Sequence, residues 1–165
     1  MSELGDSARS LRDAFDRAFA KAASSPATAH SDFLAIRAGG QPRAIALAEI
    51  GGLHVDRRVT AIPTPVAGLL GLVGLRGVMV PLYDLRVLLG TNPVDEPRWM
   101  VTAAAAPVGF AFDGFDGHLR LDEADVARGP TDLVVAGGVT RPVISLVTLI
   151  AELERRIAGV PSRET

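Results

Sequence analysis

The sequence predicts an all-β domain built from two small SH3-like barrels, with a helical segment at each end of the chain. Three observations predict it: short apolar runs separated by turn signals, 17 glycines and 11 prolines among 165 residues, and a strand–helix pattern that occurs twice. Short strands with closely spaced turns are typical of a barrel or a sandwich. The length fits a single domain.

Residues 7–23 predict an N-terminal helix, because large apolar residues recur every fourth position and so share one face: Leu11, Phe15 and Phe19. The polar, proline-containing stretch 24–28 predicts a linker. This helix either packs on its own domain or serves as a partner-binding arm. We expect the segment 1–31 to be separable from the rest of the chain.

Eight short apolar runs after the linker predict strands, because each is bounded by turn-forming residues. They are residues 33–36, 44–47, 53–55, 59–62, 69–75, 78–83, 99–102 and 108–112. Two further stretches predict helices. Asp84 can cap a short helix over 85–89, which Gly90 would end. Residues 146–157 are apolar at helical spacing and finish in a basic pair, which suits a helix C-terminus.

The sequence contains an internal repeat, in which Gly77–Pro81 is similar to Gly138–Pro142, 61 residues later. The two copies stay aligned without a gap into the predicted helix that follows each of them. The shared pattern is G-V-x-x-P-x-x-x-L-x-x-L-[LI]. Two copies are too few for a solenoid, so the repeat predicts two similar half-domains. Proline lacks a backbone N–H, so we expect each proline at a strand edge or a bulge.

The composition argues against several classes of function. Without cysteine, the chain has no disulfide scaffold and no thiolate metal site. A net charge of −2 gives no general support for nucleic-acid binding. The longest uncharged stretch, 59–75, is broken by glycine and proline and is shorter than the roughly 20 residues that a membrane span needs. No signal-peptide pattern is visible, and we expect a cytoplasmic protein.

Motifs for catalysis or cofactor binding are missing from the sequence. The glycine-rich stretch 68–77 matches neither of the phosphate-binding motifs G-x-G-x-x-G and G-x-x-x-x-G-K-[ST]. The three histidines are far apart in the sequence: His30, His54 and His118. We expect no cofactor and no metal. Paired carboxylates in the acidic run 113–125 leave an enzyme open as a third interpretation. Turn chemistry around Gly114 and Gly117, together with a solvated face, is favoured there.

Arg76 is a charged residue in a position that none of these motifs explains. It lies between two apolar runs and precedes Gly77, which indicates the end of a turn. It is either a solvated turn residue or an interface residue, since arginine is enriched at protein interfaces.

Residues 33–90 resemble the CheW family of chemotaxis coupling proteins. The family pattern I-P-x-x-P-x-x-I-x-G-V-x-N-L-R-G-x-I-x-P-V-x-D-L-R is matched by Ile62–Pro65, Leu70–Gly77 and Val78–Arg86. The segments 108–114 and 138–150 are similar to the second half of the family pattern. The resemblance implies a CheW-like domain over residues 32–157, followed by a tail, 158–165.

The resemblance implies two interlocked five-stranded barrels, in agreement with the repeat, and no catalytic activity. It further implies an adaptor that bridges the cytoplasmic tip of a chemoreceptor and the regulatory domain of a histidine kinase, recruited to receptor arrays without inserting into the membrane. The alternative is a structural or assembly β-barrel that binds proteins but has no kinase partner.

The resemblance also implies a partner-binding site. The family's interface arginine corresponds to Arg76, beside Gly77, and its hydrophobic partner surface lies near Ile50 and Leu53. The glutamate of a family V-x-E-I segment is placed on Gly52. Two further positions depart from the family pattern, Gly74 in place of asparagine and Ser145 in place of aspartate, and leave the choice of partner open.

Overall fold

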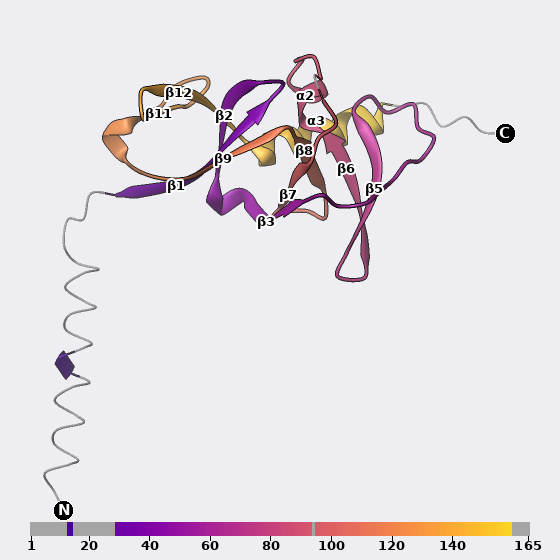
Figure 1. Cartoon of the computed structure of the whole chain (residues 1–165), viewed down its shortest axis with the longest axis horizontal. Helices are drawn as coiled ribbons and strands as arrows, with labels where there is room; N and C mark the ends of the chain where they lie inside the picture. The colour runs from indigo at the N-terminus through magenta and orange to yellow at the C-terminus, as the bar shows by residue number, and fades with distance from the viewer. Residues whose placement is uncertain (1–12, 15–28, 94, 160–165) are drawn as a thin grey trace, which may run out of the picture. The chain divides into compact units, whose positions relative to one another are not determined.

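The computed structural model describes residues 13–14, 29–93 and 95–159 (Figure 1). The chain divides into two units, Met1–His30 and Ser31–Thr165, and the second unit holds both sheets apart from the first residue of β1. Most of the predicted helix 7–23 and of the tail 158–165 lies outside the described residues. The separability of the segment 1–31 therefore stays a prediction.

The first sheet contains six strands in the order β10-β11-β12-β2-β1-β9. Its members come from both ends of the chain: β1 His30–Ala38, β2 Gln41–Ala46, β9 Gly114–Asp122, β10 Val126–Ala127, β11 Leu133–Ala136 and β12 Val139–Ile144. The second sheet, in the order β3-β7-β8-β6-β5-β4, uses the middle of the chain. Its strands are β3 Ile50–Val55, β4 Val59–Thr60, β5 Leu69–Leu75, β6 Val78–Asp84, β7 Trp99–Ala103 and β8 Gly109–Phe112.

The structure confirms the mostly β character of the fold and its division into two sheets. Each sheet has six strands rather than the expected five, because the two-residue strands β10 and β4 extend one edge of each. Closure of the sheets into SH3-like barrels stays a prediction.

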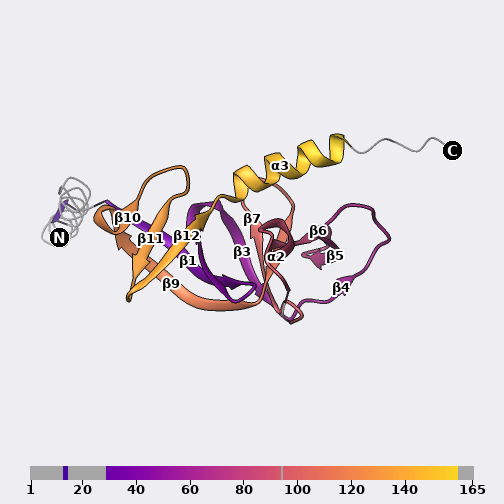
Figure 2. The same ribbon diagram turned by 90° about the horizontal axis from the view of Figure 1, so that it is seen from above.

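The internal repeat corresponds to a repeated strand arrangement. The hairpins β5–β6 and β11–β12 lie on opposite sides of the fold (Figure 2). In both copies the second strand also pairs in parallel with a third strand, β8 or β2, starting at Leu82 and Val143 respectively. Each of these residues directly follows the repeat proline, Pro81 or Pro142. The prolines therefore lie where only one neighbouring strand is paired, as expected.

Two helices follow the repeated strands, and a polar side chain caps each one. Asp84 accepts a hydrogen bond from the backbone N–H of Arg86 (3.0 Å) at the start of α2, Leu85–Leu88. Ser145 accepts one from the backbone N–H of Thr148 (3.3 Å) at the start of α3, Leu146–Ala158. Two short 3-10 helices, η1 Leu47–Glu49 and η2 Glu123–Asp125, complete the elements. The cap at Asp84 is as predicted, and α3 begins at Leu146, where the predicted helix 146–157 begins.

The largest core cluster is shared by the two sheets and α3. The first sheet supplies Leu34, Ile36 and Ile45, the second supplies Tyr83, Phe110 and Phe112, and α3 supplies Leu146 and Leu153. Because one apolar cluster spans both sheets, their relative placement is part of the core packing.

The turn chemistry predicted around Gly114 and Gly117 is wrong, because Gly114–Asp122 forms β9. The strand shows two-residue alternation, with Leu119 and Leu121 more buried than the charged residues between and after them. Aspartate and glycine in this segment concealed the alternation, and the pairing with β1 decides the conformation. The strand β11 was also missed, because Leu133–Ala136 is not among the eight apolar runs predicted to form strands.

Candidate functional site

The turn of the β5–β6 hairpin holds Arg76 and Gly77 at its two central positions. Their φ angles are +50° and +80°, and positive φ at both positions is the signature of the type I′ turn that two-residue hairpins favour. Glycine adopts this conformation without steric cost. The turn leaves Arg76 exposed. Within the described residues, its guanidinium has no ion-pair or hydrogen-bond partner.

Apolar side chains flank this turn on β6 and are left uncovered. Val78 is 56% exposed and Met79 is 54% exposed. Consecutive residues of a strand point to opposite faces, so both faces of the hairpin end are open. The hairpin projects beyond the rest of its sheet (Figure 1). Exposed large apolar side chains gathered in one place are typical of a binding surface.

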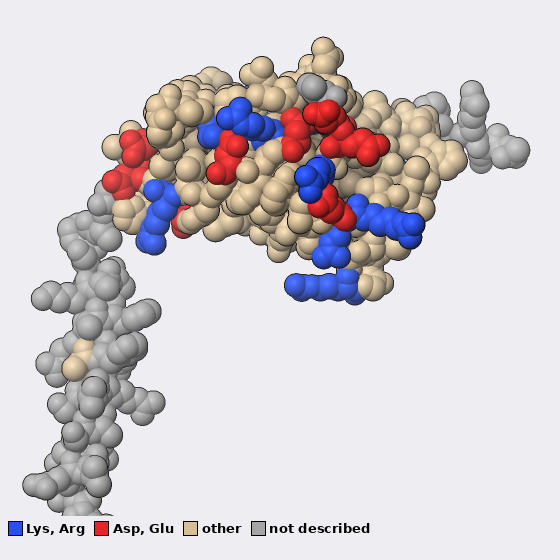
Figure 3. Space-filling view, in the orientation of Figure 1, with Lys and Arg blue, Asp and Glu red and all other residues tan. Residues whose placement is uncertain are grey.

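Two more arginines lie beside the hairpin. Val59 pairs with Val73 in antiparallel register, so the preceding residues, Arg58 and Arg57, run toward the turn along the edge of β5. Figure 3 shows basic side chains at the lower right of the molecule, where the hairpin projects, and acidic side chains above them. We call this group the hairpin surface: Arg57, Arg58, Arg76, Val78 and Met79.

The positive charges of the hairpin surface act on His54 of β3. Partial burial holds the pKa of His54 below its usual value, and the positive charges of Arg57 and Arg76 lower it further. Gly52 lies against the same ring, because a Cβ atom at this position would lie 2.9 Å from Nε2 of His54. The absence of a side chain at Gly52 therefore makes room for the imidazole.

Gly52 therefore lies against the imidazole whose pKa the charge of Arg76 lowers. Ile50 and Leu53 behave differently, because both are partly buried and pack against the main core cluster. Only part of each side chain is accessible to a partner. All five residues remain predicted partner contacts.

Sequence reasoning missed Glu49, although the signal was present. Leu47–Ile50 reads L-A-E-I and fits the family's V-x-E-I segment, so the motif glutamate is Glu49 and not position 52. The Leu146 backbone N–H donates to Oε2 of Glu49 (2.6 Å), and the Ser145 hydroxyl donates to Oε1 (3.2 Å). At the N-terminus of a helix, a carboxylate accepts a hydrogen bond from a backbone N–H that has no partner within the helix. Its negative charge also interacts favourably with the positive end of the helix dipole. Glu49 therefore fixes the start of α3.

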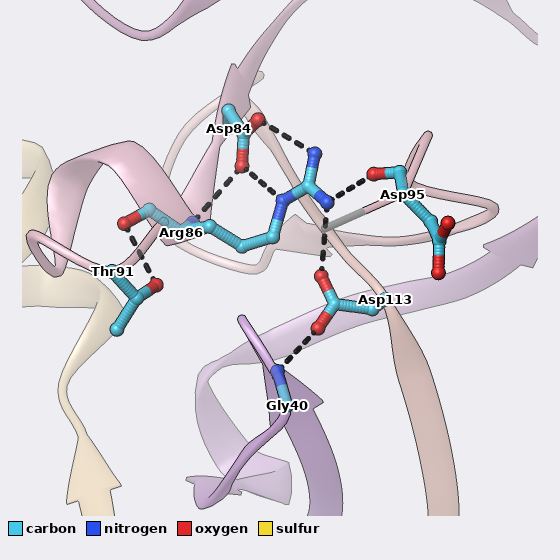
Figure 4. A network of polar contacts seen from close by, with 6 residues as sticks. All are labelled: Gly40, Asp84, Arg86, Thr91, Asp95 and Asp113. Atoms are coloured by element: carbon cyan, nitrogen blue, oxygen red, sulfur yellow. Dashed lines mark hydrogen bonds and ion pairs between the residues drawn. The ribbon is translucent and has the colours of Figure 1, made fainter. Parts of the chain in front are cut away.

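Arg86 is the centre of a buried polar network (Figure 4). It is 2% exposed. Its Nε and Nη2 each donate to Asp84 at 2.9 Å, and Nη1 lies 3.1 Å from Oδ1 of Asp113. Nη1 also donates to the carbonyl of Asp95. The other oxygen of Asp113 accepts from the backbone N–H of Gly40 (2.8 Å). The network therefore joins α2 to the β1–β2 turn of the first sheet.

Carboxylates of the acidic run 113–125 are engaged in structural contacts. Asp113 belongs to the network of Arg86, and Asp116 accepts hydrogen bonds from Arg141 (2.8 Å) and Arg37 (3.2 Å). These ion pairs give no support to the enzyme interpretation. Across residues 13–14, 29–93 and 95–159, no group of histidine and carboxylate side chains is arranged to hold a metal ion. No helix in the same ranges is long and apolar enough to span a membrane.

Comparisons with known proteins agree with this fold. Residues 32–157 match the family model described as a CheW-like domain. Among solved structures, the scaffolding protein TtCheW from Thermoanaerobacter tengcongensis is similar, with a TM-score of 0.65 and 14% sequence identity over 72% of this chain and 90% of that chain. At this identity the likeness concerns the fold. A search of curated protein sequences finds no significant match. The chain belongs to the family of CheW-like domains.

Proposed function

We propose that this protein is a non-enzymatic adaptor in a chemotaxis-type, two-component signalling complex. It couples the cytoplasmic tip of a chemoreceptor to the regulatory domain of a histidine kinase. It acts in the cytoplasm and joins receptor arrays through its partners, without inserting into the membrane. Membership of the CheW-like family supports the adaptor role.

The observation that carries the proposal is the hairpin surface. Arg76 and Gly77 form a rigid two-residue turn, and the exposed side chains of Val78 and Met79 follow immediately. An unpaired arginine beside exposed apolar residues is the usual composition of a protein-binding hot spot. The other predicted contacts, Ile50, Gly52 and Leu53, lie on β3, the strand that also carries His54.

Binding measurements with the receptor tip and the kinase regulatory domain from the same genome test the proposal. We expect Arg76→Ala to weaken binding to at least one of them by about 2 kcal/mol, which is roughly thirtyfold in affinity. Arg76→Glu should weaken it further through charge repulsion. Stability should change by less than about 0.5 kcal/mol for an exposed site.

The matched control is Arg120→Ala, an exposed arginine on β9 of the other sheet, which should leave both affinities unchanged. If wild type binds neither partner, the adaptor role is wrong and an assembly protein without a kinase partner is favoured. If both Arg76 variants bind like wild type, the receptor and kinase contacts lie elsewhere.

We also propose that residues 32–157 fold as one domain, to which 1–31 and 158–165 are appended. The large core cluster draws all of its members from within 34–153. Removing residues 1–30 should therefore lower the melting temperature by no more than about 4 °C, which corresponds to less than about 1 kcal/mol. Circular dichroism melting of the two chains measures this. A drop of more than about 10 °C would place the N-terminal segment in the core.

A further inference from the structure

We propose that a cavity beside the start of α3 binds an organic carboxylate with an apolar body, and that the guanidinium of Arg43 holds the carboxylate. Such a group belongs either to a small organic acid or to the C-terminus of a peptide. The cavity shares no residue with the hairpin surface, and the inference goes beyond the proposed function. Two observations carry it: a preformed cavity of ligand size, and an arginine in its wall that has no partner in the protein.

The cavity has a volume of about 500 Å³, which is within the range of small-molecule sites. Its walls come from β2, β12, the segment 129–132, the first turn of α3 and Leu89. Figure 2 shows β12 leading directly into α3 beside β11. The backbone N–H of Val143 on β12 donates to the carbonyl of Asp132 (2.7 Å). The segment 129–132 is thus held against β12, and the fold itself forms the cavity.

Arg43 is the one cationic residue among the described residues that line the cavity. Its Nε is buried from water and has no hydrogen-bond partner, and its guanidinium forms no ion pair with a described carboxylate. A buried N–H without an acceptor is destabilising, and such groups are rare in native proteins. A bound carboxylate would accept from this N–H and supply the missing counter-charge.

Asp132 is the other charged residue of the lining, and its charge is already balanced. Its Oδ2 accepts a hydrogen bond from Arg128 (2.7 Å), and its Oδ1 accepts one from the backbone N–H of Gly129 (3.2 Å). The hydrogen bond from Arg128, followed by that from Gly129, holds the pKa of Asp132 below its usual value. Because Arg128 pairs with Asp132, the positive charge of Arg43 is left over.

The N-terminus of α3 is not available to the ligand's carboxylate. Glu49 already accepts hydrogen bonds from the backbone N–H of Leu146 (2.6 Å) and from the hydroxyl of Ser145 (3.2 Å). The hydroxyl of Thr148 is also engaged with Ser145 (3.1 Å). A second carboxylate would have to compete with Glu49 there, whereas no acidic group competes for Arg43. We therefore place the carboxylate of the ligand at Arg43.

The apolar part of the wall selects the body of the ligand. Inorganic phosphate would leave this part of the wall in water and would bring a second negative charge toward Asp132. A carboxylate attached to an aromatic or branched group covers the apolar wall and still pairs with the planar guanidinium. Four apolar residues contribute to this wall: Leu89, Pro130, Pro142 and Leu149.

Titration of matched acids and amides into the full ¹⁵N-labelled chain, followed by NMR, tests the inference. One pair is phenylacetate and the neutral phenylacetamide. The other is a tripeptide that ends in phenylalanine, with a free or an amidated C-terminus. We expect an acid to shift the Nε–H signal of Arg43 and the amide signals of Thr131 and of residues 145–149, while its amide leaves them unchanged. Tighter binding of phenylacetate identifies a small organic acid as the ligand, and tighter binding of the tripeptide acid identifies a peptide end.

Variants of Arg43 test its part in binding. Arg43→Gln removes the charge and should weaken binding of the acid by about tenfold or more. Arg43→Lys keeps the charge but loses the Nε–H and the planar fork, and should weaken binding by about threefold or more. The matched control is Arg120→Gln, an exposed arginine on β9, which should bind like wild type. If the glutamine variant does not fold, the lysine variant decides.

Each of four results would overturn the inference. They are no binding of either acid, equal binding of an acid and its amide, signal shifts confined to other regions, and unchanged affinity in a folded Arg43 variant. A loss of the same size in Arg120→Gln would count in the same way, because it would show that the acids respond to the overall charge and not to Arg43.

Discussion

The two copies of the internal repeat share a backbone design but differ in what they expose. Both hairpins turn through two residues with positive φ, +50° and +80° at Arg76–Gly77 and +57° and +76° at Gly137–Gly138. In the first copy an arginine, Arg76, occupies the turn, and the two residues after Gly77, Val78 and Met79, are exposed. The second has glycine in both turn positions. The same local structure therefore exposes an arginine and two apolar side chains in one copy and only glycine at the turn of the other.

The copies also bury an arginine at different places. In the first copy Arg86 is buried in α2, whereas the equivalent residue of α3, Val147, is 53% exposed. In the second copy the buried arginine is Arg141, on the strand, where the first copy has Val80. Arg141 donates to the carbonyls of Ile36 (3.1 Å) and Arg43 (3.4 Å) as well as to Asp116. Arg86 connects the two sheets, whereas Arg141 holds together strands of one sheet.

The largest expected effect comes from removing the arginine that joins the sheets. Arg86→Ala leaves Asp84 and Asp113 with uncompensated charge in a buried site, so the free energy of unfolding should fall by about 3–5 kcal/mol. Urea denaturation measures this. The control is Arg98→Ala, which breaks the exposed pair with Asp56 and should leave the free energy of unfolding nearly unchanged, because water screens the two charges. A loss below about 1 kcal/mol for Arg86→Ala would show that the network does not connect the sheets energetically.

A smaller effect is expected in the second copy. Asp116 faces Arg141 but keeps some contact with water, so Asp116→Asn should cost about 1 kcal/mol at neutral pH. Burial raises the pKa of Asp116, but hydrogen bonds from Arg141 and Arg37 outweigh it and hold the pKa below the usual 3.8. The ionised group therefore stabilises the fold above pH 3.8, and this contribution is lost as the pH falls below that value.

Urea denaturation of wild type and Asp116→Asn at pH 7 and at pH 3 measures how much stability the ionised Asp116 contributes. The stability difference between them should narrow on acidification. A difference that stays constant or widens at pH 3 would show that the charge of Asp116 does not stabilise the fold.

The smallest effect concerns the contact between β3 and the hairpin surface. The positive charge of Arg76 lowers the pKa of His54, after the larger contribution of burial. Because removing a nearby cation makes protonation easier, Arg76→Ala should raise the pKa of His54. An NMR titration of the imidazole measures it, with Arg120→Ala as the control. An unchanged pKa in Arg76→Ala would show that the charge of Arg76 does not reach His54.

Much of the fold follows from signals that act over a few residues. The apolar run 69–75 coincides with β5, and the caps Asp84 and Ser145 mark the starts of both α-helices. The two copies of the repeat predicted two similar half-domains with a proline at a strand edge or bulge in each, before any contact was known. Local patterns succeed here because turn geometry and capping depend on neighbouring backbone groups.

The candidate site was predictable only in part. Arg76 and Gly77 stood out because a charge interrupted an apolar run. The roles of Arg57, His54 and Met79 depend on the pairing of β4 with β5 and on the position of β3, which no short pattern records. The misplacement of the motif glutamate has a different cause, since the L-A-E-I segment at Glu49 was readable in the sequence.

By itself, the sequence determined the β-rich fold class, the strand positions in the first half, the repeat and the turn at Arg76. Tertiary structure alone decided that Gly114–Asp122 forms a strand, that Glu49 binds the start of α3, and that Arg86 joins the sheets through Asp113. Hydrogen bonds in turns and caps join residues a few positions apart, so their partners are read together in the chain. Glu49 and Leu146 lie 97 positions apart, and only the burial of a common core brings such groups within bonding distance.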